Sequence, residues 1–248
     1  ESYTIAISLD GDFIEGYCNL TKLQIKQSKY TIAEQTCLNG IARKTNSHVI
    51  YNILGMALSN QGKADQAIEA YRHSITLRPD YPDVRNNLSI LYRANKQWDA
   101  AIEECLNAIR LDPSNPIYIY NMADILTELN RPEQALNAII KGLNRLPENP
   151  MLLFKHGVLL ANQGRYQAAA ASYMKAISVN PNHADSHYNL GILLAKAGNL
   201  RQAWREMEWR FHSNFSRRSS LNIDFGLPIP PQWRGEPLDG KSILILPE

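Results

Sequence analysis

Apolar and small residues return along the chain at intervals of three and four, in short stretches that come in pairs. One pair has Tyr51, Leu54 and Leu58 in its first stretch and Ala67 and Tyr71 in its second. This spacing gathers apolar side chains on one face of an α-helix. The pattern therefore predicts a helix–turn–helix unit, and the chain is expected to be all-α.

The paired stretches repeat every 34 residues, as shown by four prolines at that spacing: Pro79, Pro113, Pro147 and Pro181. A series of alanines keeps the same register: Ala33, Ala67, Ala101, Ala135, Ala169 and Ala203. A single helical pair cannot bury its apolar face alone, so stacked neighbours must supply the core. Six units are predicted, with these first residues: Ile14, His48, Pro82, Pro116, Pro150 and Ala184.

Helix ends are marked by residues with special backbone properties. Glycine falls where the first helix of a unit must stop, at Gly62, Gly164 and Gly198. Asn130 holds the same place in another unit, and both residue types tolerate the left-handed conformation of a helix C-cap. Proline begins several units, where it suits the first helical turn. Asn115 and Asn149 precede two of these prolines and are predicted N-caps.

The period, the small residues and the terminal proline together resemble the tetratricopeptide repeat, from Ile14 to about Arg210. The best single match consists of Tyr51, Leu54, Gly55, Leu58, Ala67, Tyr71 and Pro79. Arg85 and His187 depart from the pattern in the slot for a large aromatic residue, and Thr45 replaces a proline. The resemblance implies a right-handed superhelical solenoid that binds another protein or peptide.

Three segments are expected along the chain. Residues 1–11 align with the end of a second helix and are interpreted as the tail of a truncated repeat. Residues 12–213 form the solenoid of six repeats. Residues 214–248 are interpreted as a linker followed by one strand, Ile243–Leu246, because a short apolar run with β-branched residues favours a buried strand. A lone strand has no partner in a helical chain, so it is expected to begin an α/β domain that follows.

The C-terminal junction resembles that of certain bacterial proteins in which tetratricopeptide repeats precede a GT-B glycosyltransferase domain. Its residues are Glu208-Trp209-Arg210, Pro231-Gln232-Trp233-Arg234-Gly235 and Leu238-Asp239-Gly240-Lys241. Those domains are similar to heptosyltransferases and O-linked N-acetylglucosamine transferases. The resemblance implies a substrate-recognition arm for a larger enzyme, with catalysis beyond Glu248.

The first helices of such a solenoid line its inner face, so the fifth and sixth residues of each unit are the candidate partner contacts, with one ninth residue. The candidates are Asn19, Asn52, Asn86, Asn87, Tyr120, Asn121, Asp124, Phe154, Tyr188 and Asn189. Amide side chains both donate and accept, so a row of them can pair with an extended backbone. The row resembles the asparagine ladder of the O-linked N-acetylglucosamine transferase solenoid. The alternatives are that the asparagines bond neighbouring backbone and the aromatic residues pack between first helices.

Composition excludes several other classes of function. The net charge is +2, from 26 basic and 24 acidic residues, so nucleic acid is not an expected partner. No apolar run approaches the roughly 20 residues of a membrane helix. The three cysteines, Cys18, Cys37 and Cys105, suggest no disulfide framework and favour a reducing, cytoplasmic location. His183 and His187 are four residues apart but lack a third ligand, so no metal or cofactor is expected.

The sequence therefore favours a protein-interaction module without an active site of its own. If a glycosyltransferase domain follows, the protein bound by this module would be the one that accepts the sugar. The alternative is a free-standing scaffold that assembles several proteins. Association through exposed repeat ends is a further expectation, since stacking surfaces at a cut end remain uncovered.

Overall fold

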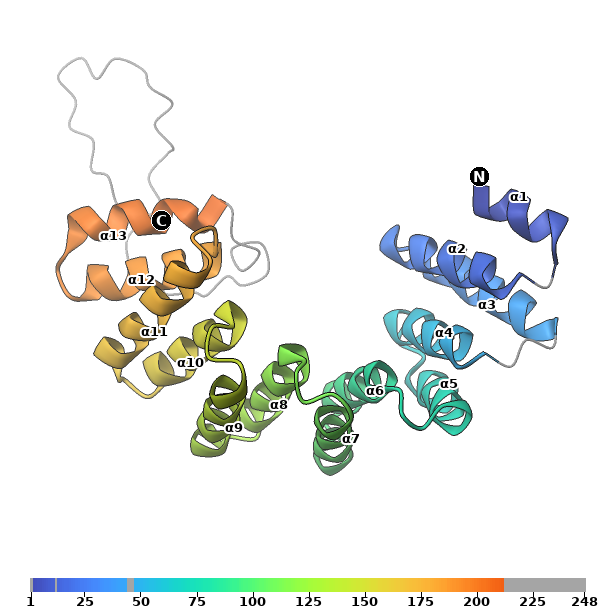
Figure 1. Cartoon of the computed structure of the whole chain (residues 1–248), viewed down its shortest axis with the longest axis horizontal. Coiled ribbons are helices and arrows are strands. Elements are labelled where there is room, and N and C mark those ends of the chain that lie inside the picture. Colours follow the sequence, from blue (N-terminus) through green and yellow to red (C-terminus); the bar gives the residue numbers. More distant parts are fainter. Residues whose placement is uncertain (1, 12, 44–46, 212–248) are drawn as a thin grey trace, which may run out of the picture. The chain divides into compact units, whose positions relative to one another are not determined.

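The computed structural model describes residues 2–11, 13–43 and 47–211, and their regular elements are all helical (Figure 1). The α-helices are α1 (Ser2–Leu9), α2 (Ile14–Lys26), α3 (Tyr30–Ala42), α4 (His48–Asn60), α5 (Ala64–Leu77), α6 (Pro82–Ala94), α7 (Trp98–Leu111), α8 (Pro116–Glu128), α9 (Pro132–Arg145), α10 (Pro150–Asn162), α11 (Tyr166–Val179), α12 (Ala184–Lys196) and α13 (Leu200–Met207). A 3₁₀ turn, η1 (Glu208–Phe211), follows. The predicted all-α class is confirmed, while the proposed linker and strand lie outside the described residues.

The helices fall into two compact units, one ending at Leu146 and the other starting at Pro147. In the N-terminal unit, α2, α4, α6 and α8 are the first helices of their repeats, and α3, α5, α7 and α9 are the second helices. Neighbouring first helices contact each other as well as their own second helices. The first helices therefore lie on the inner side of the curve in this unit and the second helices on the outer side (Figure 1). The other unit contains α10 to α13 and η1.

Helix starts follow the local signals in the sequence. Each first helix begins at the residue expected for its repeat, from Ile14 in α2 to Ala184 in α12. The side chain of Asn115 accepts from the backbone N–H of Ile117, and that of Asn149 accepts from Leu152. Both N-caps are therefore confirmed. None of the described helices combines the length and apolar character that crossing a membrane requires.

The turn between the two helices of a repeat contains one residue in the left-handed region. Gly62, Gly164 and Gly198 have φ of 76°, 74° and 80°, and Asn130 has 55°, as the C-cap prediction requires. Ser28 and Lys96 hold the same place with φ of 59° and 57°, which the sequence did not predict. The repeat imposes this backbone geometry even where the side chain does not favour it. The last second helix, α13, ends at Met207 and continues as the 3₁₀ turn η1.

Inside each repeat, the size of one residue on the first helix matches the size of one on the second. A Cβ added at Gly55 would lie 2.5 Å from the ring of Tyr71, and one at Gly157 would lie 2.4 Å from Tyr173. Where the first-helix residue is larger, the second-helix residue is smaller, as in the pairs Thr21 with Cys37, Ser89 with Cys105 and Ala123 with Ile139. All of these second-helix residues are almost fully buried. The paired sizes set how closely the two helices of a repeat approach.

Candidate functional site

The inner face of the N-terminal unit is held together by asparagine pairs between neighbouring first helices. Asn87 Nδ2 on α6 donates to Asn52 Oδ1 on α4 at 3.0 Å, and Asn121 Nδ2 on α8 donates to Asn86 Oδ1 on α6 at 2.8 Å. In each pair the sixth residue of one repeat bonds the fifth residue of the repeat before it. The amides therefore bond side chains of adjacent repeats, an arrangement that repeat spacing alone did not predict.

The two members of each asparagine pair differ in exposure. Asn52 and Asn86 are buried, each 6% exposed, while Asn87 and Asn121 are half-buried. Asn52 Nδ2 also lies 3.4 Å from the hydroxyl oxygen of Tyr81. An amide oxygen carries two lone pairs, and within the described ranges the side-chain oxygens of Asn87 and Asn121 accept no hydrogen bond. These two oxygens are available to an N–H group of a partner.

Charged and phenolic groups cross-link the same face. Arg93 on α6 forms ion pairs with Asp124 Oδ2 at 3.3 Å and Glu128 Oε1 at 3.6 Å, both on α8. The Tyr118 hydroxyl on α8 donates to Asp83 Oδ1 on α6 at 2.6 Å, and burial, followed by that carboxylate, raises its pKa. Of these five residues, only Asp124 was predicted from its repeat position. The signal for the other four is a residue of complementary charge or polarity in the next repeat.

The predicted aromatic row is divided between the two units. Tyr120 in α8 is half-buried, and so is Tyr188 in α12. Phe154 in α10 is only 7% exposed, and its ring packs 5.9 Å from that of Tyr173 and 5.4 Å from that of His183. Tyr120 therefore offers side-chain surface next to the asparagine pairs, whereas Phe154 contributes mainly to the interior of its own unit.

Two remaining candidates lie apart from the asparagine pairs. Asn189 in α12 donates to the backbone oxygen of Asp185 one turn earlier, at 2.8 Å. Asn19 in α2 is exposed, and the fifth residue of that repeat is the buried Cys18 rather than an asparagine. The paired arrangement therefore joins α4, α6 and α8.

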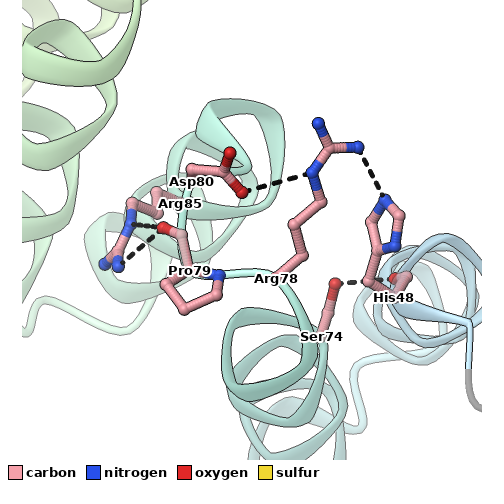
Figure 2. Close-up of polar contacts among 6 residues, drawn as sticks. All are labelled: His48, Ser74, Arg78, Pro79, Asp80 and Arg85. Atoms are coloured by element: carbon pink, nitrogen blue, oxygen red, sulfur yellow. Dashed lines mark hydrogen bonds and ion pairs between the residues drawn. The ribbon is translucent and has the colours of Figure 1, made fainter.

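Beside these helices, a polar cluster fixes the junction between the second and third repeats (Figure 2). Ser74 Oγ donates to the backbone oxygen of His48 at 2.7 Å, and Arg78 lies between the His48 ring and Asp80, with Nη1 3.3 Å from His48 Nε2. Arg85 donates from its guanidinium to the backbone oxygen of Pro79 at 3.2 Å. Each side chain in the cluster bonds the neighbouring turn or helix, so the cluster is structural.

The His48 ring makes this junction sensitive to pH. Burial, followed by the charge of Arg78, lowers the pKa of His48 below its ordinary value of 6.5. The unfolded chain therefore binds a proton at a pH where folded His48 does not, and stability falls as the pH drops from 6.5 towards the folded pKa. We expect His48→Gln to flatten the pH dependence of the unfolding free energy between pH 7.5 and about 5. Urea titrations across that range measure it, and equal slopes for both proteins would contradict it.

Metal-binding clusters and reactive thiols are two kinds of site that the described residues do not show. These residues contain no group of three or more His, Cys, Asp or Glu side chains placed to hold a metal ion. All three cysteines are buried free thiols, and burial raises the pKa of Cys37 and Cys105 to about 12. Thiols with so high a pKa are poor nucleophiles. The chemistry of the inner face is therefore that of hydrogen bonding and ion pairing.

Comparison with known sequences identifies the repeats. The family described as "Tetratricopeptide repeat" matches residues 54–116, and the one described as "TPR repeat" matches residues 157–198. The chain therefore contains tetratricopeptide repeats. A search of curated proteins gives no match.

Solved structures agree on the fold. A structure from a functional characterization of pilF of Pseudomonas aeruginosa aligns with a TM-score of 0.64 at 19% identity, covering 82% of this chain and 90% of that one. A chain of the APC/C hetero-tetramer Cut9–Hcn1 aligns with 0.63 at 12% identity, covering 84% and 41%. MamA aligns with 0.52 at 18% identity, covering 66% and 96%. At these identities the likeness concerns the fold, which is that of a tetratricopeptide-repeat solenoid.

Proposed function

We propose that the inner face of the N-terminal unit binds an extended segment of a partner protein, and that the asparagine pairs form hydrogen bonds with the backbone of that segment. The unused oxygens of Asn87 and Asn121 carry the proposal, because they occupy equivalent places on successive first helices. A backbone N–H is present at every residue except proline, so such contacts hold a peptide whatever its side chains. The tetratricopeptide repeats support a role in protein interaction or scaffolding.

The neighbouring residues set the character of the bound segment. Tyr120 supplies an aromatic surface, and aromatic side chains provide contact area at low entropic cost. Arg93 is already paired with Asp124 and Glu128, so its guanidinium is not a free cation for the C-terminal carboxylate of a partner. An internal segment of the partner therefore fits this face better than its terminus.

The proposed hydrogen bonds to the peptide backbone are tested with peptides that are selected from a random library by their binding to the immobilised chain. We expect Asn87→Ala and Asn121→Ala each to raise the Kd of a selected peptide about tenfold, equivalent to about 1.4 kcal/mol. Fluorescence anisotropy measures the Kd. N-methylation of the peptide backbone at one or two positions should weaken binding similarly, because it removes the donor that the amide oxygens accept.

The control variant is Asn144→Ala, an exposed asparagine on the second helix α9. It should leave the Kd unchanged, and circular dichroism should show the helical content of all variants to be equal. Binding that tolerates both N-methylation and the two inner-face substitutions would contradict the proposal.

The C-terminal junction supports a finer proposal, that the bound protein is the acceptor of a glycosyltransferase that this unit serves. Its support is the resemblance of residues 208–241 at the end of the repeats, most of which lie outside the described residues. The coding frame beyond Glu248 tests it. About 200 or more residues of alternating strands and helices, the size of a further domain or two, would support the enzyme arm. A stop codon would favour the free-standing scaffold, in the reducing cytoplasm suggested by three free thiols.

A further inference from the structure

A second surface lies on the outer side of the N-terminal unit, away from the asparagine pairs. It is an open groove of about 320 Å³ between the second helices α7 and α9, with α8 as its floor. Its apolar lining consists of Ile102, Leu106, Ile109, Ile119, Met122 and Leu126. We call this surface the outer groove. Successive residues of an α-helix turn by about 100°, so Met122 points about 200° from Tyr120, to the opposite side of α8.

The outer groove is apolar at two positions that carry a polar pair in two other repeats. In the third repeat, Arg85 Nη1 on α6 bonds Glu104 Oε2 on α7 at 2.8 Å. In the sixth repeat, His187 on α12 pairs with Glu206 on α13 at the same two repeat positions. In the fourth repeat these positions hold Ile119 and the small Ala138, which both line the outer groove. The two positions that hold a polar pair in the third and sixth repeats are therefore apolar in the outer groove.

Charge distinguishes the outer groove from similar grooves elsewhere in the chain. The groove between α3, α4 and α5 is lined at equivalent repeat positions but contains the acidic Glu34 and Glu69. The outer groove contains no acidic side chain, and its two charged lining residues are Lys141 and Arg145. Neither forms an ion pair with any residue in the described part of the chain. An apolar channel with an unpaired basic rim is complementary to an apolar segment that carries acidic side chains.

The form of the groove indicates the form of its occupant. Its lining on α9 runs from Gln134 to Arg145, which spans about 16 Å at the helical rise of 1.5 Å per residue. A helix of about three turns laid between two helices fills such a channel with residues at i, i+3, i+4 and i+7. We propose that the outer groove docks an amphipathic acidic helix of a partner protein, independently of the peptide bound on the inner face.

The proposal is tested with a fluorescein-labelled, lactam-stapled peptide of about 14 residues, bearing leucines at i, i+3, i+4 and i+7 and glutamates beside them. Fluorescence anisotropy should show saturable binding to the full chain. Leu106→Glu should weaken binding at least tenfold, because it places a carboxylate in the apolar channel facing the glutamates. Lys141→Glu combined with Arg145→Glu should also weaken it at least tenfold and remove most of its salt dependence.

Leu38→Glu is the matched control, because Leu38 holds the same repeat position two repeats earlier and is 43% exposed against 45% for Leu106. It should leave the Kd unchanged. A peptide with lysines in place of the glutamates should bind at least tenfold more weakly. The proposal would be overturned if Leu38→Glu weakened binding as much as Leu106→Glu does, or if the lysine peptide bound as tightly as the glutamate peptide. It would also be overturned if, among the variants, only Asn87→Ala weakened binding. Sedimentation velocity that shows a dimer dissolved by Leu106→Glu would overturn it too, since the occupant would then be a second copy of the chain.

Discussion

Replacing Gly55 by alanine is expected to destabilise the N-terminal unit by about 2–3 kcal/mol, the usual cost of an overfilled core. The added Cβ would lie 2.5–2.6 Å from two ring carbons of Tyr71, which is itself 3% exposed and cannot move into solvent. The better helix propensity of alanine offsets only about 1 kcal/mol of the strain. Urea unfolding followed by circular dichroism measures the change in the free energy of unfolding.

A double-mutant cycle isolates the size match from other effects. Tyr71→Ile alone should cost about 2 kcal/mol through the cavity that it leaves. Combined with Gly55→Ala, it reproduces the pair Ala123 and Ile139 of the fourth repeat, so the double variant should lose less than the two single losses added together. If the two losses in unfolding free energy simply added, the residues at positions 55 and 71 would contribute to stability independently of each other's size.

The second large effect concerns the ion pair of Arg85 and Glu104. These side chains are 17% and 19% exposed, so removing either one leaves its partner charged and poorly solvated. We expect Arg85→Ile and Glu104→Ala each to lower the unfolding free energy by about 2 kcal/mol, below the full cost for a deeply buried pair because some solvent reaches both groups.

Replacing both residues at once should behave differently. Arg85→Ile with Glu104→Ala copies Ile119 and Ala138 of the fourth repeat, and apolar replacement of a buried pair is often neutral. The double variant should unfold within about 1 kcal/mol of the parent chain, as measured by urea titration at constant salt. A double variant less stable than both single variants would contradict this expectation, and would indicate that the hydrogen bond from Arg85 to the Pro79 backbone oxygen contributes as well.

The main features of the fold were predictable because each depends on residues close together in sequence. The spacing of Pro79, Pro113 and the later prolines predicts the repeats, and Asn115 marks a helix start through a bond to Ile117. Lys96 was not predicted to have a positive φ, because its own side chain gives no such signal. Its conformation is imposed by the two helices that the turn must join.

The site was only partly predictable because its contacts link different repeats. Repeat position predicted that Asn52 and Asn87 lie on first helices, but not that they bond each other across 35 residues. That contact depends on the offset between α4 and α6. The outer groove was missed for a similar reason, since Ile119 and Ala138 lie on different helices and only packing brings them into one channel.

The contacts of the described helices have a consequence for how the chain folds. Their extensive contacts reach only one or two elements along the sequence. Little loop entropy must be lost before such local contacts form, so a chain of this kind has a low contact order and is expected to fold quickly. Nucleation can begin at different repeats and spread to their neighbours. A substitution that disrupts one size-matched pair should therefore unfold its own repeat and the repeats beside it before the remaining repeats unfold.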